Sequence, residues 1–229
     1  ANIFYSISTK SYLDIIKLLE NYQQRIKSLK YNVDNLNETA KLYYNIALCY
    51  QKAKYYKISL QYLDFSIDIF NNQIDFENLI KAWILQAINY NNSYQVIESI
   101  NLYEKAIDLI KKIKLSNENL IESIYNNLGY CYEVQENNIK ALEYYQKFKG
   151  TKDKNFTNII NLARIHYKLN KKSEMLIYLD EIPINVSDES IVIQKNLLQK
   201  MYSENDYLDI NEEARKTLIK DIKYFYKSN

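Results

Sequence analysis

The sequence predicts an all-α protein, a right-handed α-solenoid of helical hairpins, and three observations lead to this prediction. The 229 residues include only two Gly and one Pro, too few for the turns of a β-rich fold or the glycine loops of a nucleotide-binding fold. A helical pattern recurs along the chain, and each copy is followed by a second helical pattern. One position of the pattern is always small, and it holds Ala47, Ala87, Gly129 and Ala163.

Each copy predicts a hairpin of two amphipathic helices. The first helix carries a large residue, a small residue four positions later and an aromatic residue three beyond that, and these spacings place all three on one helical stripe. The copies are Tyr43-Ala47-Tyr50, Trp83-Ala87-Tyr90, Tyr125-Gly129-Tyr132 and Ile159-Ala163-His166. The second helix repeats as Ser59-Leu63-Ser66, Ser99-Tyr103-Ala106, Ala141-Tyr145-Phe148 and Met175-Leu179-Ile182. We expect the two helices to pack antiparallel, because the small residue lets them approach closely.

The spacing between copies predicts hairpins of unequal length. The small residues of the third and fourth copies lie 34 positions apart, whereas the earlier intervals are 40 and 42 positions. We expect the longer intervals to come from second helices that are longer by one or two turns, or from longer links. Thr39, Asp75 and Ser116 are expected to cap the first helices that follow them or to lie in the links.

The recurring hairpin resembles the tetratricopeptide repeat, a helical hairpin of about 34 residues. The resemblance covers residues 40–183. A single amphipathic helix is expected over 10–30, before the array. A degenerate helix pair is expected over residues 188–227, with helices at 188–203 and 211–227. This pair is expected to cap the array, because end repeats need an atypical outer face. Residues 1–229 are therefore predicted to form a single repeat domain.

One stripe of each first helix is predicted to face a groove. If the small residue is numbered position 8, position 6 lies about 200° from it at about 100° per residue, and it faces away from the partner helix. In a stacked array that face lines a concave groove, together with positions 2, 5, 9, 12 and 13. Position 6 holds Asn45, Leu85, Asn127 and Asn161. The neighbouring positions include Asn126, Tyr130, Arg164 and Lys81.

These asparagines are candidates for binding a peptide backbone, because a carboxamide offers both a donor and an acceptor. Neighbouring first helices lie roughly 10 Å apart, and an extended peptide advances about 3.3 Å per residue. Asn127 and Asn161 are therefore expected to contact such a peptide at about every third residue. The alternative is that they are ordinary surface residues of an Asn-rich protein.

The composition argues against several other classes of protein. A net charge of +2 is too balanced for a chain that binds nucleic acid by itself, and no apolar run approaches the length of a membrane span. Cys49 and Cys131 make neither a disulfide framework nor a zinc site, so we expect both to be small core residues. A cytoplasmic protein without a cofactor or metal is the expectation.

No catalytic role is expected either. His166 is the only histidine, and it occupies the position that Tyr50 and Tyr132 hold in other copies, which favours packing. The acidic pair Asp180 and Glu181 has no accompanying nucleophile or base in the pattern.

Charge is distributed unevenly over the last third of the chain. Residues 140–172 carry nine Lys or Arg and two acidic residues, whereas residues 173–213 carry ten acidic residues and two Lys. Three interpretations remain open: solvated helix faces, attraction of an acidic or C-terminal carboxylate group to the basic stretch, or pairing of the two stretches in a homodimer.

The long repeats, the leading helix, the Asn at the groove position and the C-terminal cap resemble the repeat domain of peptide-sensing regulators of the RRNPP family (Rap, Rgg, NprR, PlcR and PrgX types). The resemblance implies a quorum-sensing transcriptional regulator that binds a short signalling peptide in its groove, through residues matching Asn45, Asn127 and Asn161. Leu85 departs from that pattern. No helix-turn-helix is expected in these residues, so nucleic acid would be bound only through another domain.

The other function that remains open is a constitutive scaffold or adaptor for a partner protein.

Overall fold

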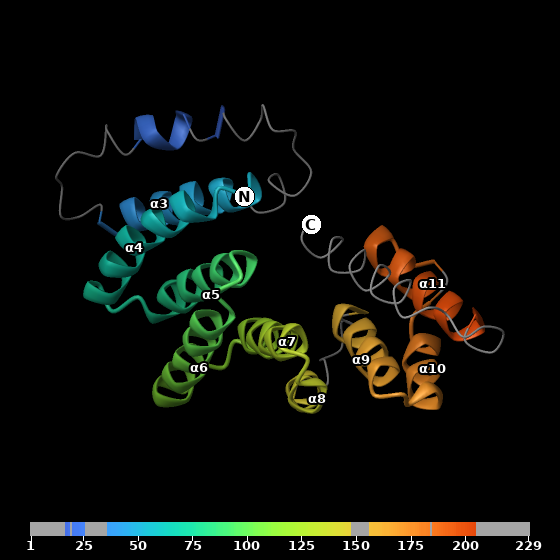
Figure 1. Cartoon of the computed structure of the whole chain (residues 1–229). Helices are drawn as coiled ribbons and strands as arrows, with labels where there is room; N and C mark the ends of the chain where they lie inside the picture. Colours follow the sequence, from blue (N-terminus) through green and yellow to red (C-terminus); the bar gives the residue numbers. More distant parts are fainter. Residues whose placement is uncertain (1–16, 19, 26–35, 148–155, 184, 205–229) are drawn as a thin grey trace. The chain divides into compact units, whose positions relative to one another are not determined.

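The computed structural model describes residues 17–18, 20–25, 36–147, 156–183 and 185–204 (Figure 1). Within these ranges the chain is helical with short turns, and no strand occurs there. From residue 36 onward, the described helices are α3 (Leu36–Lys52), α4 (Tyr56–Asn72), α5 (Phe76–Asn92), α6 (Val96–Ile113), α7 (Glu118–Val134), α8 (Asn138–Gln146), α9 (Phe156–Lys168), α10 (Lys172–Asp180) and α11 (Glu189–Glu204). The pairs α3–α4, α5–α6, α7–α8 and α9–α10 are the four predicted hairpins, and the all-α solenoid prediction is confirmed.

The flanking helices agree with the sequence as far as the described residues reach. Residues 20–25 of the expected leading helix are helical, and α11 covers the first helix of the expected capping pair. The second helix of that pair, over 211–227, lies outside the described residues.

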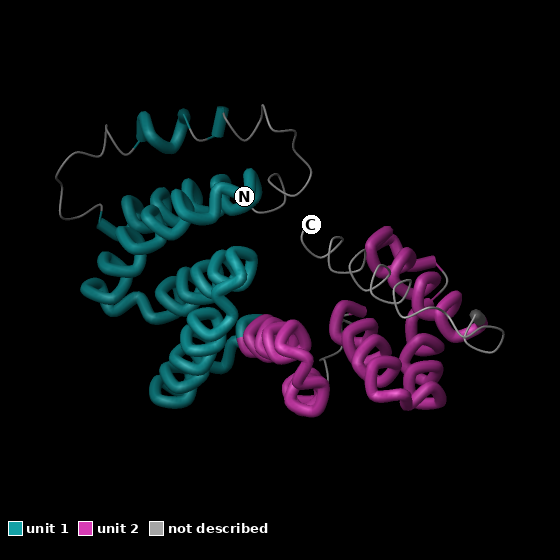
Figure 2. Tube along the Cα trace, in the orientation of Figure 1, with its two compact units in different colours: residues 1–120 teal, residues 121–229 magenta. Residues whose placement is uncertain are grey.

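The chain divides into two compact units, residues 1–120 and 121–229 (Figure 2). The first contains α3 to α6, and the second contains most of α7 together with α8 to α11. In the first unit α4 packs against both α3 and α5, and in the second α9 packs against α8, α10 and α11. That the whole chain behaves as a single domain stays a prediction.

The two helices of a hairpin pack in a constant register. At an offset of twelve positions, rings stack in three of the hairpins, as Tyr50 on Tyr62 (5.5 Å between ring centroids), Tyr132 on Tyr144 (5.2 Å) and His166 on Tyr178 (5.3 Å). The same offset lets the Ser59 hydroxyl donate to the Ala47 carbonyl at 2.7 Å. His166 therefore packs as the tyrosines do, which confirms its predicted role.

Unequal second helices account for the unequal repeat intervals. The second helices within the two longer intervals, α4 and α6, have 17 and 18 residues, whereas α8, within the shorter interval, has 9. The first of the two explanations offered by the sequence, longer second helices, is confirmed.

Six turns in the described part of the chain contain a left-handed residue that is not glycine. The residues with positive φ in the described part are Lys54, Ile74, Tyr94, Lys114, Glu136 and Asn170. Each precedes an N–H that donates to a carbonyl five residues earlier, for example Asp75 to Phe70 at 2.9 Å. This is the Schellman arrangement that ends a helix, with an ordinary residue in the left-handed position where glycine is usual.

The prediction of a cap or link residue is confirmed at two of three positions, because Asp75 caps α5 and Ser116 lies in the link before α7. Asp75 is the N-cap of α5, and its carboxylate accepts from the Asn78 N–H at 3.2 Å. At α7 the side chain of Asn117, not Ser116, accepts from the Leu120 N–H. Thr39 lies inside α3, because that helix begins at Leu36.

Each unit has its own apolar core. In the first, Tyr22 packs with Leu42, Ile46 and Cys49 of α3. In the second, α9, α10 and α11 contribute the buried residues Ile160, Ala163, Met175, Leu179, Ile182, Ile191, Leu198 and Met201. Cys49 and Cys131 are both buried thiols, as expected. Of the helices described, none is long and apolar enough to cross a bilayer.

Candidate functional site

The polar stripe predicted to face the groove is present on α7 and α9 of the second unit. Asn126, Asn127 and Tyr130 are half-buried on α7. Asn161 and Arg164 on α9 are only 3% and 4% exposed. The structure thus places these two residues in the interior, not on an open face as the helical geometry alone suggested.

The burial of Arg164 is explained by Glu133, in the last turn of α7. The Arg164 Nε and Nη2 atoms donate to the two carboxylate oxygens of Glu133, each at 2.8 Å. This is the bidentate arrangement typical of arginine–carboxylate pairs. Lys168 Nζ lies 2.6 Å from Glu133 Oε1, and the Tyr145 hydroxyl donates to Oε2 at 2.8 Å. One buried carboxylate therefore ties α7, α8 and α9 together.

The charge state of Glu133 follows from these contacts. Burial alone would raise the pKa of this carboxyl group. The positive charges of Arg164 and Lys168, and the hydrogen bonds that they donate, outweigh burial and lower the pKa of Glu133 to about 2. The group is therefore ionised at neutral pH, as an acceptor of four short contacts must be.

Two of the predicted asparagines have defined carboxamide orientations. Asn161 Oδ1 accepts from Arg164 Nη2 at 3.0 Å. Asn127 is held the other way round, since its Nδ2 donates to the Ser123 carbonyl, one turn earlier, at 2.8 Å. The carboxamide of Asn127 is therefore bonded to the backbone of its own helix, and that of Asn161 to the side chain of Arg164.

The first unit holds the remaining predicted residues. Asn45 is half-buried on α3, and Leu85, at the equivalent position of α5, is 4% exposed. Lys81 forms an ion pair with Glu77 one turn earlier on α5, at 2.8 Å. This part of the stripe is apolar on α5, where Ile84 is also buried.

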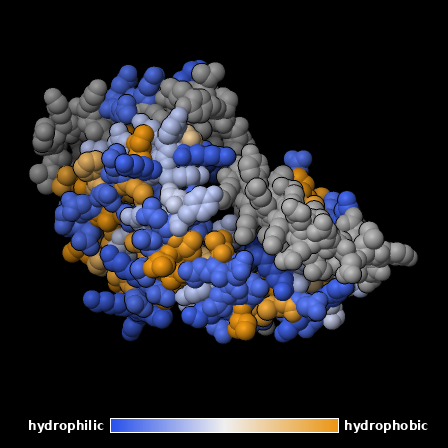
Figure 3. All heavy atoms as spheres, in the orientation of Figure 1, coloured by the Kyte–Doolittle hydropathy of each residue, from blue (hydrophilic) through white to orange (hydrophobic). Residues whose placement is uncertain are grey.

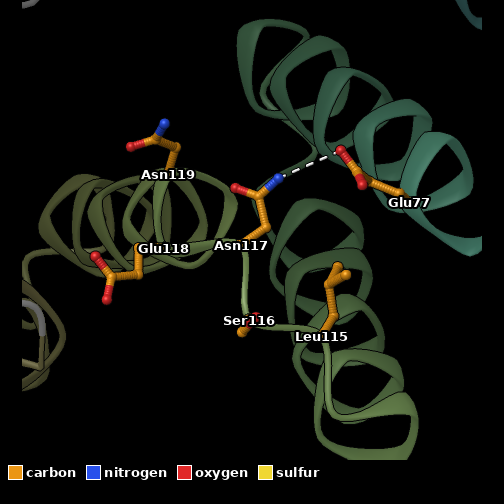
Figure 4. A pocket seen from close by; sticks show the side chains of 6 residues that line it. All are labelled: Glu77, Leu115, Ser116, Asn117, Glu118 and Asn119. Atoms are coloured by element: carbon orange, nitrogen blue, oxygen red, sulfur yellow. Dashed lines mark hydrogen bonds between the residues drawn. The ribbon is translucent and has the colours of Figure 1, made fainter.

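A surface pocket lies beside this Lys81–Glu77 pair. It is lined by Glu77 and residues 115–119 and has a volume of about 490 Å³. Figure 4 shows the Asn117 carboxamide pointing across it to Glu77, to which it donates at 3.3 Å. The other carboxylate of the pocket, Glu118, points away from Glu77 in the same view, so the two do not form an acid pair (Figure 4).

Sequence reasoning missed Glu133, Tyr145 and Lys168 as members of the polar cluster. Glu133 occupies position 12 of the third repeat, and Arg164 occupies position 9 of the fourth, so both lie on the stripe assigned to the groove. Opposite charges at these two positions of successive repeats were the available signal. Tyr145 was identified only as a packing residue.

The described residues contain neither a cluster of metal ligands nor a buried acidic pair at positions 180 and 181. No group of three or more His, Cys, Asp or Glu side chains gathers there in a way that would hold a metal ion. Asp180 and Glu181 are both exposed at the end of α10. The absence of a catalytic activity or cofactor stays a prediction.

Exposed apolar side chains gather near the turns inside the first two hairpins. Tyr55 and Ile58 are 50% and 36% exposed after the first turn, and Tyr94 and Ile97 are 78% and 65% exposed at the second. We call these four residues the turn edge. On the face drawn in Figure 3, hydrophobic residues lie in small groups among hydrophilic ones.

Comparisons with known proteins give several partial matches, two of which are bacterial regulators. No protein-family profile matches the chain. Over 121 residues it is 31% identical to the regulatory protein RapD of Bacillus subtilis, covering 50% of this chain and 32% of RapD. It is 24% identical over 138 residues to the transcriptional activator NprA of Geobacillus stearothermophilus, covering 60% of this chain and 33% of NprA. The chain resembles RRNPP-type regulators.

Solved structures of Rap and NprR proteins share the fold. The Rap conjugation gene regulator of plasmid pLS20, in complex with the Phr* peptide, matches with a TM-score of 0.70 at 15% identity, covering 92% of this chain and 59% of that one. NprR in complex with its cognate peptide NprX matches with a TM-score of 0.63 at 21% identity, covering 94% and 59%.

The chain spans about a third of the length of RapD and NprA. A further relative is the response regulator aspartate phosphatase E of B. subtilis, which is 21% identical over 178 residues, or 75% of this chain and 46% of that protein. Its name includes an enzymatic activity, whereas the names of RapD and NprA describe regulation only.

Proposed function

We propose that this chain is the peptide-binding sensor domain of a cytoplasmic quorum-sensing transcriptional regulator. Two kinds of observation support the proposal. The relatives include regulators, and two of the solved structures with the same fold are complexes with named peptides, Phr* and NprX. The chain itself carries a polar stripe on consecutive first helices, where repeat proteins present their inner surface.

The observation that carries the proposal is the pair of carboxamides on α7 and α9. Asn127 and Asn161 occupy the same position of successive repeats, and each is held in one orientation by a hydrogen bond. Carboxamides recognise the peptide backbone and do not require a particular side chain. Asn126, Tyr130 and Arg164 in this unit are proposed to contact the side chains of the same peptide, and Asn45 and Lys81 in the first unit stay predicted peptide-binding residues.

The proposed output is a change in how successive repeats stack. A ligand shifts a conformational equilibrium only if it contacts the two states differently. The buried Glu133–Arg164 pair connects the third repeat to the fourth, so a peptide that contacts Asn161 beside Arg164 acts directly on this connection. We expect the domain to act as a homodimer, and DNA to be contacted only through another domain.

A peptide selection tests the proposal. The purified chain is panned against a library of random linear heptapeptides, and the selected heptapeptide is titrated calorimetrically, with a scrambled peptide as the control. Amide hydrogen exchange then locates the site. We expect a dissociation constant below about 100 µM, as for a specific complex, and protection on α7 and α9. Selection of no heptapeptide, or protection confined to other helices, would contradict the proposal.

The turn edge favours a second candidate function, a constitutive scaffold or adaptor for a partner protein. Tyr94 and Ile97 expose most of their apolar surface at a hairpin turn, and tyrosine is common at protein interfaces. In this case the selection would return no heptapeptide. Alternatively, a selected heptapeptide would slow amide hydrogen exchange at the turn edge and leave exchange in α7 and α9 unchanged.

A further inference from the structure

The turn edge is one continuous surface, made by two successive hairpin turns of the first unit. Asn89, in the last turn of α5, donates from Nδ2 to the Ser59 hydroxyl at the start of α4, at 2.7 Å. This buried contact holds the beginning of α4, with Ile58, against the end of α5, which leads into Tyr94. Burial, and in second place the neighbouring Tyr94, raise the pKa of Tyr56, so the side chains of the two turns lie close together.

Both turns have a defined backbone conformation. Lys54 and Tyr94 occupy the same left-handed position of their turns, with φ of 65° and 64°. In each turn the N–H of the next residue donates to the carbonyl five residues earlier, at 2.9 Å. A surface that is ordered before binding loses little conformational entropy when a partner covers it.

Exposed apolar side chains are concentrated at the turn edge. Among the described residues eight large hydrophobic side chains are exposed, and four of them, exposed by 36% to 78%, form the turn edge. A group of exposed apolar residues that includes tyrosine is typical of surfaces that bind other proteins. A partner that covers the turn edge therefore supplies apolar side chains of its own.

The charge around the turn edge is mainly positive. Residues 52–58 and 93–99, which make the two turns, include three lysines and one acidic residue, Glu98. Lys54 and Lys57 are both exposed, and each directly precedes an apolar residue of the turn edge. Charges at the rim of an interface select partners of the opposite sign. The partner that fits this surface therefore carries acidic side chains beside its apolar ones.

We propose that the turn edge is a docking surface for an acidic segment of another protein, whose apolar side chains pack on Tyr94 and Ile97 and whose carboxylates pair with Lys54 and Lys57. This inference goes beyond the proposed sensor function, because it needs no peptide on α7 or α9, and it gives the partner chemistry of the scaffold candidate. A protein segment is favoured over an anionic membrane because Glu98 is exposed beside Ile97, where it would face lipid phosphates.

A competitive selection tests the proposal. The full chain is panned against a library of random pentadecapeptides in the presence of excess Tyr94→Ser/Ile97→Ser chain, and the selected pentadecapeptide is titrated by fluorescence anisotropy. We expect it to have a net negative charge and large apolar residues, and to bind with a dissociation constant below about 100 µM. Raising the ionic strength from about 0.1 M to about 1 M should weaken binding about threefold or more, because it screens exposed charges.

Matched isoleucine variants test the apolar contact. Ile97→Ser should weaken binding of the selected pentadecapeptide about tenfold. Ile177→Ser should leave the affinity within about twofold, because this isoleucine of the second unit is exposed to a similar extent, 61% against 65%, but lies outside the turn edge. Circular dichroism checks that each variant is folded.

Matched lysine variants test the charge. Lys54→Gln/Lys57→Gln should weaken binding about threefold or more. Lys111→Gln/Lys112→Gln, which changes two exposed lysines in the last turn of α6, should leave the affinity within about twofold. If the serine double variant does not fold, Lys54→Gln/Lys57→Gln serves as the competitor in the selection.

Three results would overturn the proposal. The first is a selection that returns no pentadecapeptide in the presence of the competitor, and the second is a selected pentadecapeptide without net negative charge. The third is binding to vesicles of equal parts phosphatidylcholine and phosphatidylglycerol by wild type but not by Ile97→Ser, which would assign the turn edge to a membrane surface.

The two proposals fail separately. Ile97→Ser should bind the selected heptapeptide as wild type does, so the sensor function can be contradicted while the turn edge retains its partner. A chain that binds the heptapeptide but no acidic pentadecapeptide would contradict only the docking surface.

Discussion

The ring of Tyr145 on α8 occupies the space in which any side chain at Gly129 on α7 would lie. A Cβ atom built on Gly129 would be 2.5 Å from Tyr145 Cε1 and 2.6 Å from Cδ1. Tyr145 cannot move away easily, because its ring is fully buried and its hydroxyl donates to Glu133. The small position of the third repeat is therefore glycine for a steric reason, and the same ring supports the polar cluster.

Gly129→Ala is expected to destabilise the chain. Helix propensity alone would favour alanine by about 1 kcal/mol, but the clash with the Tyr145 ring should reverse the sign and lower the free energy of unfolding by roughly 1–3 kcal/mol. Urea denaturation followed by circular dichroism measures the difference. Gly129→Ala in a Tyr145→Leu background is the control, and there the same substitution should cost less than it does in the wild type. A more stable single variant would show that the ring is not confined.

Ile74→Gly is expected to stabilise the chain. Ile74 has a φ of 57° in the turn between α4 and α5 and is 68% exposed. A β-branched residue in this conformation costs about 1–2 kcal/mol, and glycine avoids most of it. The thermal midpoint should therefore rise. Ile97, 65% exposed but inside α6, is the matched control, and Ile97→Gly should lower stability by about 1 kcal/mol. Equal losses in both variants would contradict the explanation.

Glu133 is expected to contribute to acid sensitivity. Its folded pKa of about 2 lies below the ordinary 4.5, so the folded state binds fewer protons than the unfolded state in this interval. The contribution is complete above pH 4.5 and is lost as the pH falls toward 2. Its size is on the order of 3 kcal/mol. Free energies of unfolding measured for wild type and Glu133→Gln between pH 2 and 7 should converge at low pH. Parallel curves would contradict the ionised assignment.

His166 is expected to be replaceable by tyrosine. It stacks on Tyr178 at 5.3 Å, as Tyr132 stacks on Tyr144 at 5.2 Å. His166→Tyr should change the free energy of unfolding at pH 7 by less than about 1 kcal/mol, whereas His166→Ala should lower it by roughly 1–3 kcal/mol.

The same position should also respond to pH. Burial is the main cause that lowers the pKa of His166, so the neutral form is favoured in the folded state. Below the ordinary pKa of 6.5 the unfolded state takes up the proton more readily, and stability falls. His166→Tyr should lack this loss between pH 7 and 5. An identical pH profile in both proteins would show that His166 does not titrate as described.

The repeat could be predicted from the sequence because its packing depends on local spacing. The positions of Ala47, Gly129 and His166 follow from helical periodicity and from comparison of one copy with the next. Helix ends were harder to predict. Asn117 caps α7 one residue after Ser116, and Lys54 and Ile74 adopt a left-handed conformation that usually requires glycine, so no residue type marked these turns.

The polar cluster was predicted only in part, for a different reason. Helical geometry gives the direction of a side chain but not what lies opposite it in the next repeat. Arg164 was therefore placed on an open surface, although Glu133 of the preceding repeat lies opposite and buries it. Such pairing depends on the register between repeats, and the sequence alone does not give this register.

The central claim is that Asn127 and Asn161 bind the peptide. Its most direct test is a calorimetric titration of the selected heptapeptide into wild type and into Asn127→Ala/Asn161→Ala. Asn71→Ala/Asn101→Ala, which changes two exposed asparagines on the second helices α4 and α6, is the matched control. We expect the first double variant to bind at least about tenfold more weakly and the control to bind as wild type does. Equal affinity in all three proteins would contradict the account.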